Sequence, residues 1–266
     1  MNQKDIKTIV KEKYGQIALQ SEPAQGSCCG PVSDCCGVDY TIFSENYESQ
    51  KGYNKEADLG LGCGIPTEFA GIQPGQHVLD LGSGAGNDCF VARAIVGESG
   101  KVTGLDFSDE MLTKARSNAQ KLGFTNVDFI AGDIEEMPLD GNQFDVVISN
   151  CVLNLVPDKA KAFAEIMRVL KPGGHFCVSD VVLKGELPDK LKSDAEMYAG
   201  CVAGAMQMED YLETIQKAGF KDVKVHKQRS IEVPANILSI YLNEEEMQDF
   251  RNNKTGLFSI TVSGEK

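Results

Sequence analysis

Three cysteines in three separate segments carry the most specific chemistry in this sequence. Cys63 stands in Gly-Leu-Gly-Cys-Gly, Cys151 in Ser-Asn-Cys-Val-Leu-Asn-Leu-Val-Pro, and Cys201 in Tyr-Ala-Gly-Cys-Val. Thiolates are ligands for soft electrophiles and soft metal ions, so the three together predict a thiophilic substrate. For Cys201 simple packing is an alternative, because helical spacing would put Met197, Cys201 and Gly204 on one apolar face.

The remaining cysteines have different expected roles. Cys28-Cys29 and Cys35-Cys36 lie in a segment from Ser21 to Gly37 that is rich in glycine and proline, which predicts a mobile loop. These pairs lack the Cys-x-x-Cys spacing of zinc sites and have no nearby histidine, so we expect no zinc there. Cys89 and Cys177 fall on a predicted helix and strand, where a cysteine is usually a small core residue.

A glycine-rich turn, Asp80-Leu-Gly82-Ser-Gly84-Ala-Gly86-Asn-Asp88, follows a predicted strand. Glycines let the backbone turn tightly and approach a ligand, and the next helix presents free amide donors. The dinucleotide pattern Gly-x-Gly-x-x-Gly does not fit, because the third glycine comes one residue early. The turn therefore predicts a cofactor site, with nicotinamide the less favoured ligand.

Two acidic residues follow the next two predicted strands. Asp106 has the position to accept hydrogen bonds from both hydroxyls of a ribose. Asp133 could accept from an adenine amino group, and Ile134 could flank the adenine ring. For both acids helix capping is the alternative, because each precedes a predicted helix.

The elements that must position these residues alternate between strand and helix. Apolar runs predict strands at His77–Leu81, Val102–Leu105, Val127–Ala131, Phe144–Ser149 and His175–Val182, with a helix after each of the first four. This alternation favours a mostly parallel sheet covered on both faces. Asp109–Leu122 shows a clear helical pattern, capped by Ser108 or Asp109. Before the sheet we expect a helical start and a second helix at Glu45–Leu61.

The composition of the sequence excludes some classes of partner and of cellular compartment. With 26 basic and 39 acidic residues the net charge is -13, which disfavours nucleic acid and anionic membranes as partners. We find no membrane-span-length apolar run and no signal-peptide core at the start. Nine cysteines, an odd number, fit a reducing compartment. We therefore expect a cytoplasmic protein.

The glycine turn, Asp106, Gly132-Asp133 and Leu170-Lys-Pro-Gly-Gly174 together resemble the class I S-adenosylmethionine-dependent methyltransferases over about residues 72–182. The resemblance implies an α/β, Rossmann-like fold: a seven-stranded, mostly parallel sheet with an antiparallel last strand and helices on both faces. It places that last strand at Phe258–Gly264, paired near Asp222–His226. The cofactor residues that it implies are Asp80, Gly82, Ser83, Gly84, Gly86, Asp106, Phe107, Asp133, Ile134 and Asn150.

Within that superfamily, the segments around Cys63, Cys151 and Cys201 resemble the arsenite methyltransferases from about residue 40 to residue 204. The resemblance implies that these three cysteines bind As(III) and that an N-terminal cysteine, Cys35 or Cys36, enters disulfide chemistry. The implied reaction moves a methyl group from S-adenosylmethionine to thiolate-bound arsenic without a general base. It also implies a dithiol that returns two electrons, with thioredoxin or glutathione as the external reductant.

The expected organisation is an N-terminal segment, residues 1–71, that contributes to the arsenic site, and a cofactor-binding domain, residues 72–266. Within this domain, residues 183–220 are expected to form a helical insertion on the substrate side. Two other functions share these features. A quinone- or sterol-type carbon or oxygen methyltransferase predicts dispensable cysteines, whereas a non-catalytic arsenite-sequestering protein predicts dispensable cofactor motifs. The oligomeric state is left open.

Overall fold

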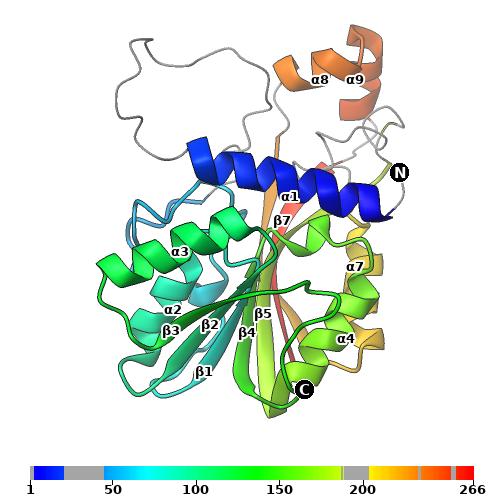
Figure 1. Ribbon diagram of the computed structural model, residues 1–266. Coiled ribbons are helices and arrows are strands. Elements are labelled where there is room, and N and C mark those ends of the chain that lie inside the picture. Colours follow the sequence, from blue (N-terminus) through cyan, green and yellow to red (C-terminus); the bar gives the residue numbers. More distant parts are fainter. Residues whose placement is uncertain (1–2, 21–44, 187, 189–203, 233–234, 253–255) are drawn as a thin grey trace, which may run out of the picture.

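A computed structural model describes residues 3–20, 45–186, 188, 204–232, 235–252 and 256–266. Within these residues, seven strands form one sheet in the order β3-β2-β1-β4-β5-β7-β6 (Figure 1). The strands are β1 His77–Leu81, β2 Lys101–Asp106, β3 Val127–Ala131, β4 Phe144–Asn150, β5 Leu170–Lys184, β6 Lys221–Ile231 and β7 Gly256–Glu265.

The first five strands pair in parallel, and β7 lies antiparallel between β5 and β6. This confirms the predicted fold class, including the pairing of the last strand near residues 222–226, where Val225 is opposite Val262. The strand order reverses between β1 and β4, and ligands of such sheets bind beyond the carboxyl ends of the strands at that point.

Helices cover both faces of the sheet. The described helices are α1 Gln3–Gln20, α2 Asn87–Val96, α3 Asp109–Lys121, α4 Lys159–Val169, α7 Met208–Lys217, α8 Ala235–Tyr241 and α9 Glu244–Asn252, with short 3-10 turns η2 Pro66–Glu68 and η3 Leu153–Leu155. In Figure 1, α2 and α3 lie on one face of the sheet and α4 and α7 on the other. Successive strand residues alternate between these layers: Val78 packs in the cluster with α2 and α3, and Leu79 in the cluster with α4 and α7.

Helix α1 lies across the carboxyl ends of the parallel strands (Figure 1). It contacts α3 through an ion pair of 3.1 Å between Lys11 Nζ and Asp109 Oδ2. On its inner side Val10 is buried in a cluster that also contains Cys63 and Cys151. The N-terminal helix thus covers the edge of the sheet where ligands of this fold bind.

Two expected helices do not form. Residues 45–61 consist of turns, because the side chains of Asn46, Asn54 and Asp58 accept hydrogen bonds from backbone N–H groups two residues ahead, at 2.8, 2.8 and 3.0 Å. Such local bonds compete with helix formation. Between β3 and β4, residues 132–143 also form turns, and Arg168 of α4 donates to the carbonyl groups of Met137 and Leu139.

The segment expected as a substrate-side insertion, residues 183–220, is only partly described. Its described helix, α7, packs against α4 and strands β5 and β6, so this part belongs to the layer that covers the sheet. Tyr211 and Ile215 are its fully buried residues, and both join the main core cluster.

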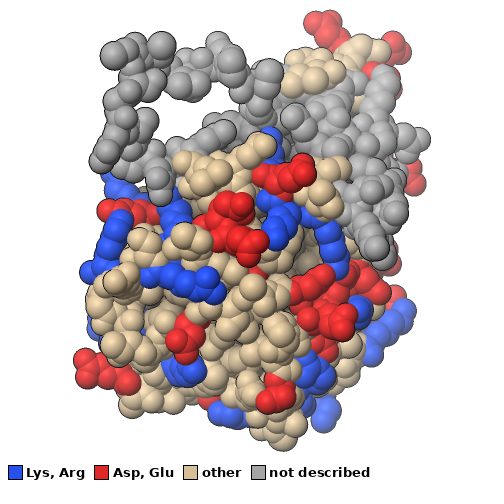
Figure 2. All heavy atoms as spheres, in the orientation of Figure 1, with Lys and Arg blue, Asp and Glu red and all other residues tan. Residues whose placement is uncertain are grey.

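Charges of both signs are intermingled over the described part of the face seen in Figure 2. Of the helices in the described ranges, none combines the length and the apolar character that crossing a membrane requires.

Candidate active site

The glycine turn between β1 and α2 brings Gly82 and Gly86 too close to their neighbours for side chains. Gly82, Gly84 and Gly86 all have positive φ, at 66°, 51° and 99°, a conformation that glycine adopts at little cost. A Cβ on Gly82 would stand 2.3 Å from Val152 Cγ2. Between these glycines, the Ser83 hydroxyl is buried and has no hydrogen-bond partner among the described residues. A buried hydroxyl of this kind is a ready position for a ligand.

Asp106 fastens the glycine turn to β2. Its carboxylate accepts from the backbone N–H groups of Gly84 and Ser108, each at 2.9 Å. The cap of α3 is Ser108, whose Oγ accepts from the Met111 N–H at 3.3 Å. Asp106 therefore does not serve as the helix cap, and it lines the cavity beside the glycine turn.

Asp133 lies at the far end of the same crevice. A smaller apolar cavity is lined there by Asp133, Ile134 and Phe107, together with Lys7 and Val10 of α1. No helix follows Asp133; its Oδ1 instead accepts from the Glu135 N–H at 2.9 Å. The two cavities share Val10, Phe107, Val152 and Leu155 and so adjoin each other.

The larger cavity is lined by three carboxyl groups: Asp80 and Asp106 are buried, and Asp88 is half-buried. Burial raises the pKa of all three; Asp88 rises to about 6, and Asp80 rises well above its ordinary value. Removal of a carboxylate from water favours its protonated form. A cationic ligand would stabilise the ionised groups, whereas the phosphates of a dinucleotide would be repelled. The cavity therefore suits a positively charged cofactor.

Asn150, at the end of β4, connects this cavity to the segment that contains Cys63. Its Oδ1 accepts from the N–H groups of Cys63 and Gly64, at 3.0 and 3.3 Å. Its Nδ2 donates to Tyr47 Oη at 2.7 Å, to the Gly64 carbonyl at 2.8 Å and to Asp88 Oδ2 at 3.1 Å. One amide side chain thereby fixes a loop from residues 45–64 against the glycine turn.

Cys63 and Cys151 lie in one buried apolar cluster at the carboxyl edge of the sheet, with 0% and 3% of their surfaces exposed. Cys151 also lines the larger cavity. Its backbone is left-handed, with φ at 59°, and its N–H donates to the Ser179 carbonyl at 2.7 Å. This conformation costs energy in a residue with a side chain, and such strain is concentrated at functional sites.

Of the other cysteines, the structure describes only Cys89 and Cys177, and both lie outside this cluster. Cys201, Cys35 and Cys36 lie outside the described residues. Cys89 and Cys177 are fully buried, as expected of core residues. Cys89 has a further role that its position in the sequence did not indicate, since its thiol donates to Asp80 Oδ2 at 3.2 Å.

A buried acid and phenol stand beside the cysteine cluster. Tyr211 Oη donates to Asp180 Oδ2 at 3.1 Å. Burial raises the pKa of Asp180 to about 7. Burial and Asp180 also raise the pKa of Tyr211, with smaller contributions from Cys63 and Cys151.

Sequence reasoning missed Tyr47, Asp88, Asp180 and Lys7 as residues of this site. Only Asp88, two residues beyond the last glycine of the turn, carried a signal that could have been used. The others reach the site through contacts between distant parts of the chain: the pair of Tyr47 and Asn150 spans 103 positions.

The sheet, its glycine turn and the acidic crevice define a Rossmann-like cofactor-binding domain of the methyltransferase class. In agreement, a family model described as "Methyltransferase domain" matches residues 72–219. An arsenite methyltransferase of Halobacterium salinarum is 41% identical over 233 residues, 83% of this chain and 59% of its own length. One from Aquipseudomonas alcaligenes is 38% identical over 243 residues, 88% of this chain and 68% of its own.

The crystal structure of an arsenic(III) S-adenosylmethionine methyltransferase from Chlamydomonas reinhardtii superimposes with a TM-score of 0.65 and 38% identity, covering 77% of this chain and 67% of that one. The chain therefore belongs to the arsenite methyltransferase family. It spans about 59% to 68% of the lengths of the two sequence relatives.

Proposed function

We propose that this protein transfers a methyl group from S-adenosylmethionine to trivalent arsenic held by the thiolates of Cys63, Cys151 and Cys201. The observation that carries the proposal is the burial of Cys63 and Cys151 in one cluster next to the acidic cavity. Asn150 connects the two features, because it binds the backbone of Cys63 and immediately precedes Cys151. The names of the relatives support arsenic as the thiophilic substrate.

The residues at the crevice fit S-adenosylmethionine. Asp106 and the unpartnered hydroxyl of Ser83 stand where a ribose could be bound, and the glycine turn lines the cavity at Gly82 and Gly84. Phe107, Asp133 and Ile134 would hold the adenine. The acids Asp80 and Asp88, with Asn150, would face the charged amino-acid end. This cofactor supplies a methyl carbon activated by an adjacent sulfonium.

The protein's own contribution is to hold the arsenic. Three thiolates coordinate the metalloid and leave its lone pair free to form the new bond to carbon, so no side chain has to remove a proton. The fixed positions of Cys63 and Cys151 reduce the entropy lost in reaching the reactive arrangement. The strained backbone at Cys151 is consistent with this positioning.

Loss of the arsenic lone pair to carbon is formally a two-electron oxidation of the metalloid. A pair of thiols that becomes a disulfide returns these electrons. Cys35 or Cys36 would form that disulfide with Cys63, and thioredoxin or glutathione would reduce it. Support for this part comes from the sequence resemblance alone, because both N-terminal cysteines lie outside the described residues.

One assay tests the proposal against both alternatives. Purified protein is incubated with S-adenosylmethionine, a thiol and arsenite, and methylated arsenic is measured by chromatography with elemental detection. We expect methylated product from the wild type and from Cys177→Ser, and none from Cys63→Ser. Arsenite binding without product would favour sequestration. Methylation of quinone or sterol precursors, unaffected by Cys63→Ser, would favour the other methyltransferase class.

A further inference from the structure

Helix α1 forms one wall of the cavity assigned above to adenine. Lys7 and Val10 line this cavity opposite Ile134, and Val10 and Tyr14 also line the larger cavity. The helix therefore extends over both parts of the crevice, and Figure 1 shows it across the carboxyl ends of the parallel strands. A ligand in the crevice would be enclosed on that side by α1.

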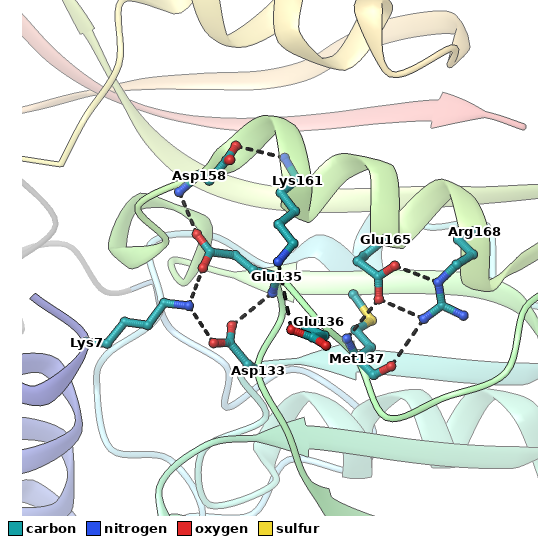
Figure 3. Close-up of polar contacts among 9 residues, drawn as sticks. All are labelled: Lys7, Asp133, Glu135, Glu136, Met137, Asp158, Lys161, Glu165 and Arg168. Atoms are coloured by element: carbon teal, nitrogen blue, oxygen red, sulfur yellow. Dashed lines mark hydrogen bonds and ion pairs between the residues drawn. The ribbon is translucent and has the colours of Figure 1, made fainter. Parts of the chain in front are cut away.

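One ion-pair cluster fastens α1 to the loop between β3 and β4. Lys7 Nζ lies 2.5 Å from Asp133 Oδ2 and also pairs with Glu135 Oε2 (Figure 3). Glu135 is itself fixed, because its Oε1 accepts from the Asp158 N–H at 2.6 Å. Asp158 in turn caps α4, where its Oδ1 accepts from the Lys161 N–H at 2.9 Å. Lys7 is therefore held by carboxylates that belong to the rigid part of the domain.

The carboxylate of Asp133 retains acceptor capacity in this arrangement. Its Oδ1 accepts from the Glu135 N–H and its Oδ2 from Lys7. A carboxylate offers about four acceptor positions, so each oxygen can take a further donor such as an adenine amino group. The ion pair with Lys7 engages Asp133 as a carboxylate, which accepts hydrogen bonds and donates none. The Lys7 Nζ also fixes the direction of the Asp133 carboxylate.

We infer that Lys7 is a positioning residue for the cofactor: it orients Asp133 toward the adenine amino group and fastens α1 over the adenine cavity. This inference rests on the cofactor assignment of the proposed function. It assigns the N-terminal helix a part in the binding of S-adenosylmethionine, which the spacing of the sequence motifs did not indicate. The same contact joins adenine binding to the cysteine cluster, because Val10 lies one turn after Lys7 and packs with Cys63 and Cys151.

Binding of S-adenosylhomocysteine and of adenosine, measured by calorimetry without arsenic, tests the inference. We expect Lys7→Gln to weaken both ligands by about fivefold, the effect of losing partly exposed ion pairs. Lys7→Arg should restore the affinity to within about twofold, because it keeps the charge and the donors. Lys161→Gln is the matched control. This substitution also removes one positive charge from the same cluster, in which Lys161 pairs with Glu136 at 3.9 Å. Lys161 does not line the adenine cavity.

Two further measurements separate positioning from a general structural role. In an Asp133→Asn background, Lys7→Gln should cost less adenosine affinity than it does in the wild type, because the carboxylate that Lys7 orients is gone and only its pairing with Glu135 remains to be lost. In the wild type, adenosine should slow tryptic cleavage at the lysines of α1, and Lys7→Gln should abolish this protection. If Lys7→Gln does not fold, wild-type α1 that is cleaved equally fast with and without adenosine would overturn the inference.

The outcomes distinguish this inference from the proposed function. A wild type that binds neither S-adenosylhomocysteine nor adenosine would overturn the cofactor assignment itself. A wild type that binds both, with Lys7→Gln unchanged, would overturn the role of Lys7 and leave the proposed function intact.

Discussion

Replacement of Asn150 by alanine tests whether one side chain holds the Cys63 segment in place. The substitution leaves the Cys63 N–H without its acceptor and removes one of the two side-chain hydrogen bonds to Asp88. The Gly64 carbonyl keeps its bond from Tyr47 Oη at 3.0 Å. A buried group left unsatisfied costs about 1 to 3 kcal/mol, so we expect Asn150→Ala to lower the free energy of unfolding by roughly 2 to 4 kcal/mol.

The loss should depend on pH. Burial raises the pKa of Asp88 to about 6, above its ordinary value of 3.8, so the native state binds more protons than the unfolded state between these values. The contribution of Asp88 to stability is therefore full below pH 3.8 and is lost as the pH rises through about 6. The Asn150 hydrogen bond lowers this pKa, and its removal should raise the pKa further. Asn150→Ala should consequently cost more at pH 8 than at pH 5.

Urea unfolding at pH 5 and pH 8 measures the stability, and the rate of Cys63 alkylation measures the opening of its loop. Asn154→Leu is a matched control four residues away, because the side-chain amide of Asn154 is buried and has no partner among the described residues. Its replacement should be nearly neutral. A loss below about 0.5 kcal/mol for Asn150→Ala, with an unchanged alkylation rate at Cys63, would refute the role given to Asn150.

Further substitutions address the cofactor and the thiols. Asp106→Ala should weaken S-adenosylmethionine roughly tenfold to hundredfold, as measured by calorimetry, while arsenite still binds; unchanged affinity would remove Asp106 from the site. Cys151→Ser should abolish arsenic methylation because a hydroxyl is a hard, poorly ionised ligand. Cys177→Ser should retain activity, and comparable rates for the two variants would contradict the ligand assignment. Single Cys35→Ser and Cys36→Ser variants should keep partial multiple-turnover activity and the double variant should lose it. A fully active double variant without a disulfide to Cys63 would exclude the relay.

The sheet was predictable because its strands are short apolar runs bounded by turn residues. Helix α3 was predictable because Ser108 marks its start and the apolar spacing marks its buried face. The prediction of a helix at residues 45–61 was wrong. Its apolar spacing was outweighed by the side chains of Asn46, Asn54 and Asp58, which bind the backbone locally. Helical spacing alone does not show where such bonds form.

The site was predictable where its residues follow directly from strand ends, as at Asp80, Asp106 and Asn150. It was unpredictable where a residue arrives from a distant segment. Lys7 and Asp133 are separated by 126 positions, and a lysine on the predicted N-terminal helix has no local feature that sets it apart from its neighbours. Such partners are fixed only when the whole chain has packed.

The place of β7 between β5 and the edge strand β6 bears on how the protein is made. The Ser259 hydroxyl donates to the Cys63 carbonyl at 2.5 Å across 196 positions. The hydroxyl groups of Thr261 and Ser179 are hydrogen-bonded to each other, and the Ser179 carbonyl accepts from the Cys151 N–H. During translation, neither cysteine has this support until β7 has left the ribosome. Until then β5 presents an open edge on the growing polypeptide, the kind of edge that invites association with other chains. The cluster that contains Cys63 and Cys151 is thus completed only after β7 has been made, and nascent chains carry these two thiols without that support while the six preceding strands are already synthesised.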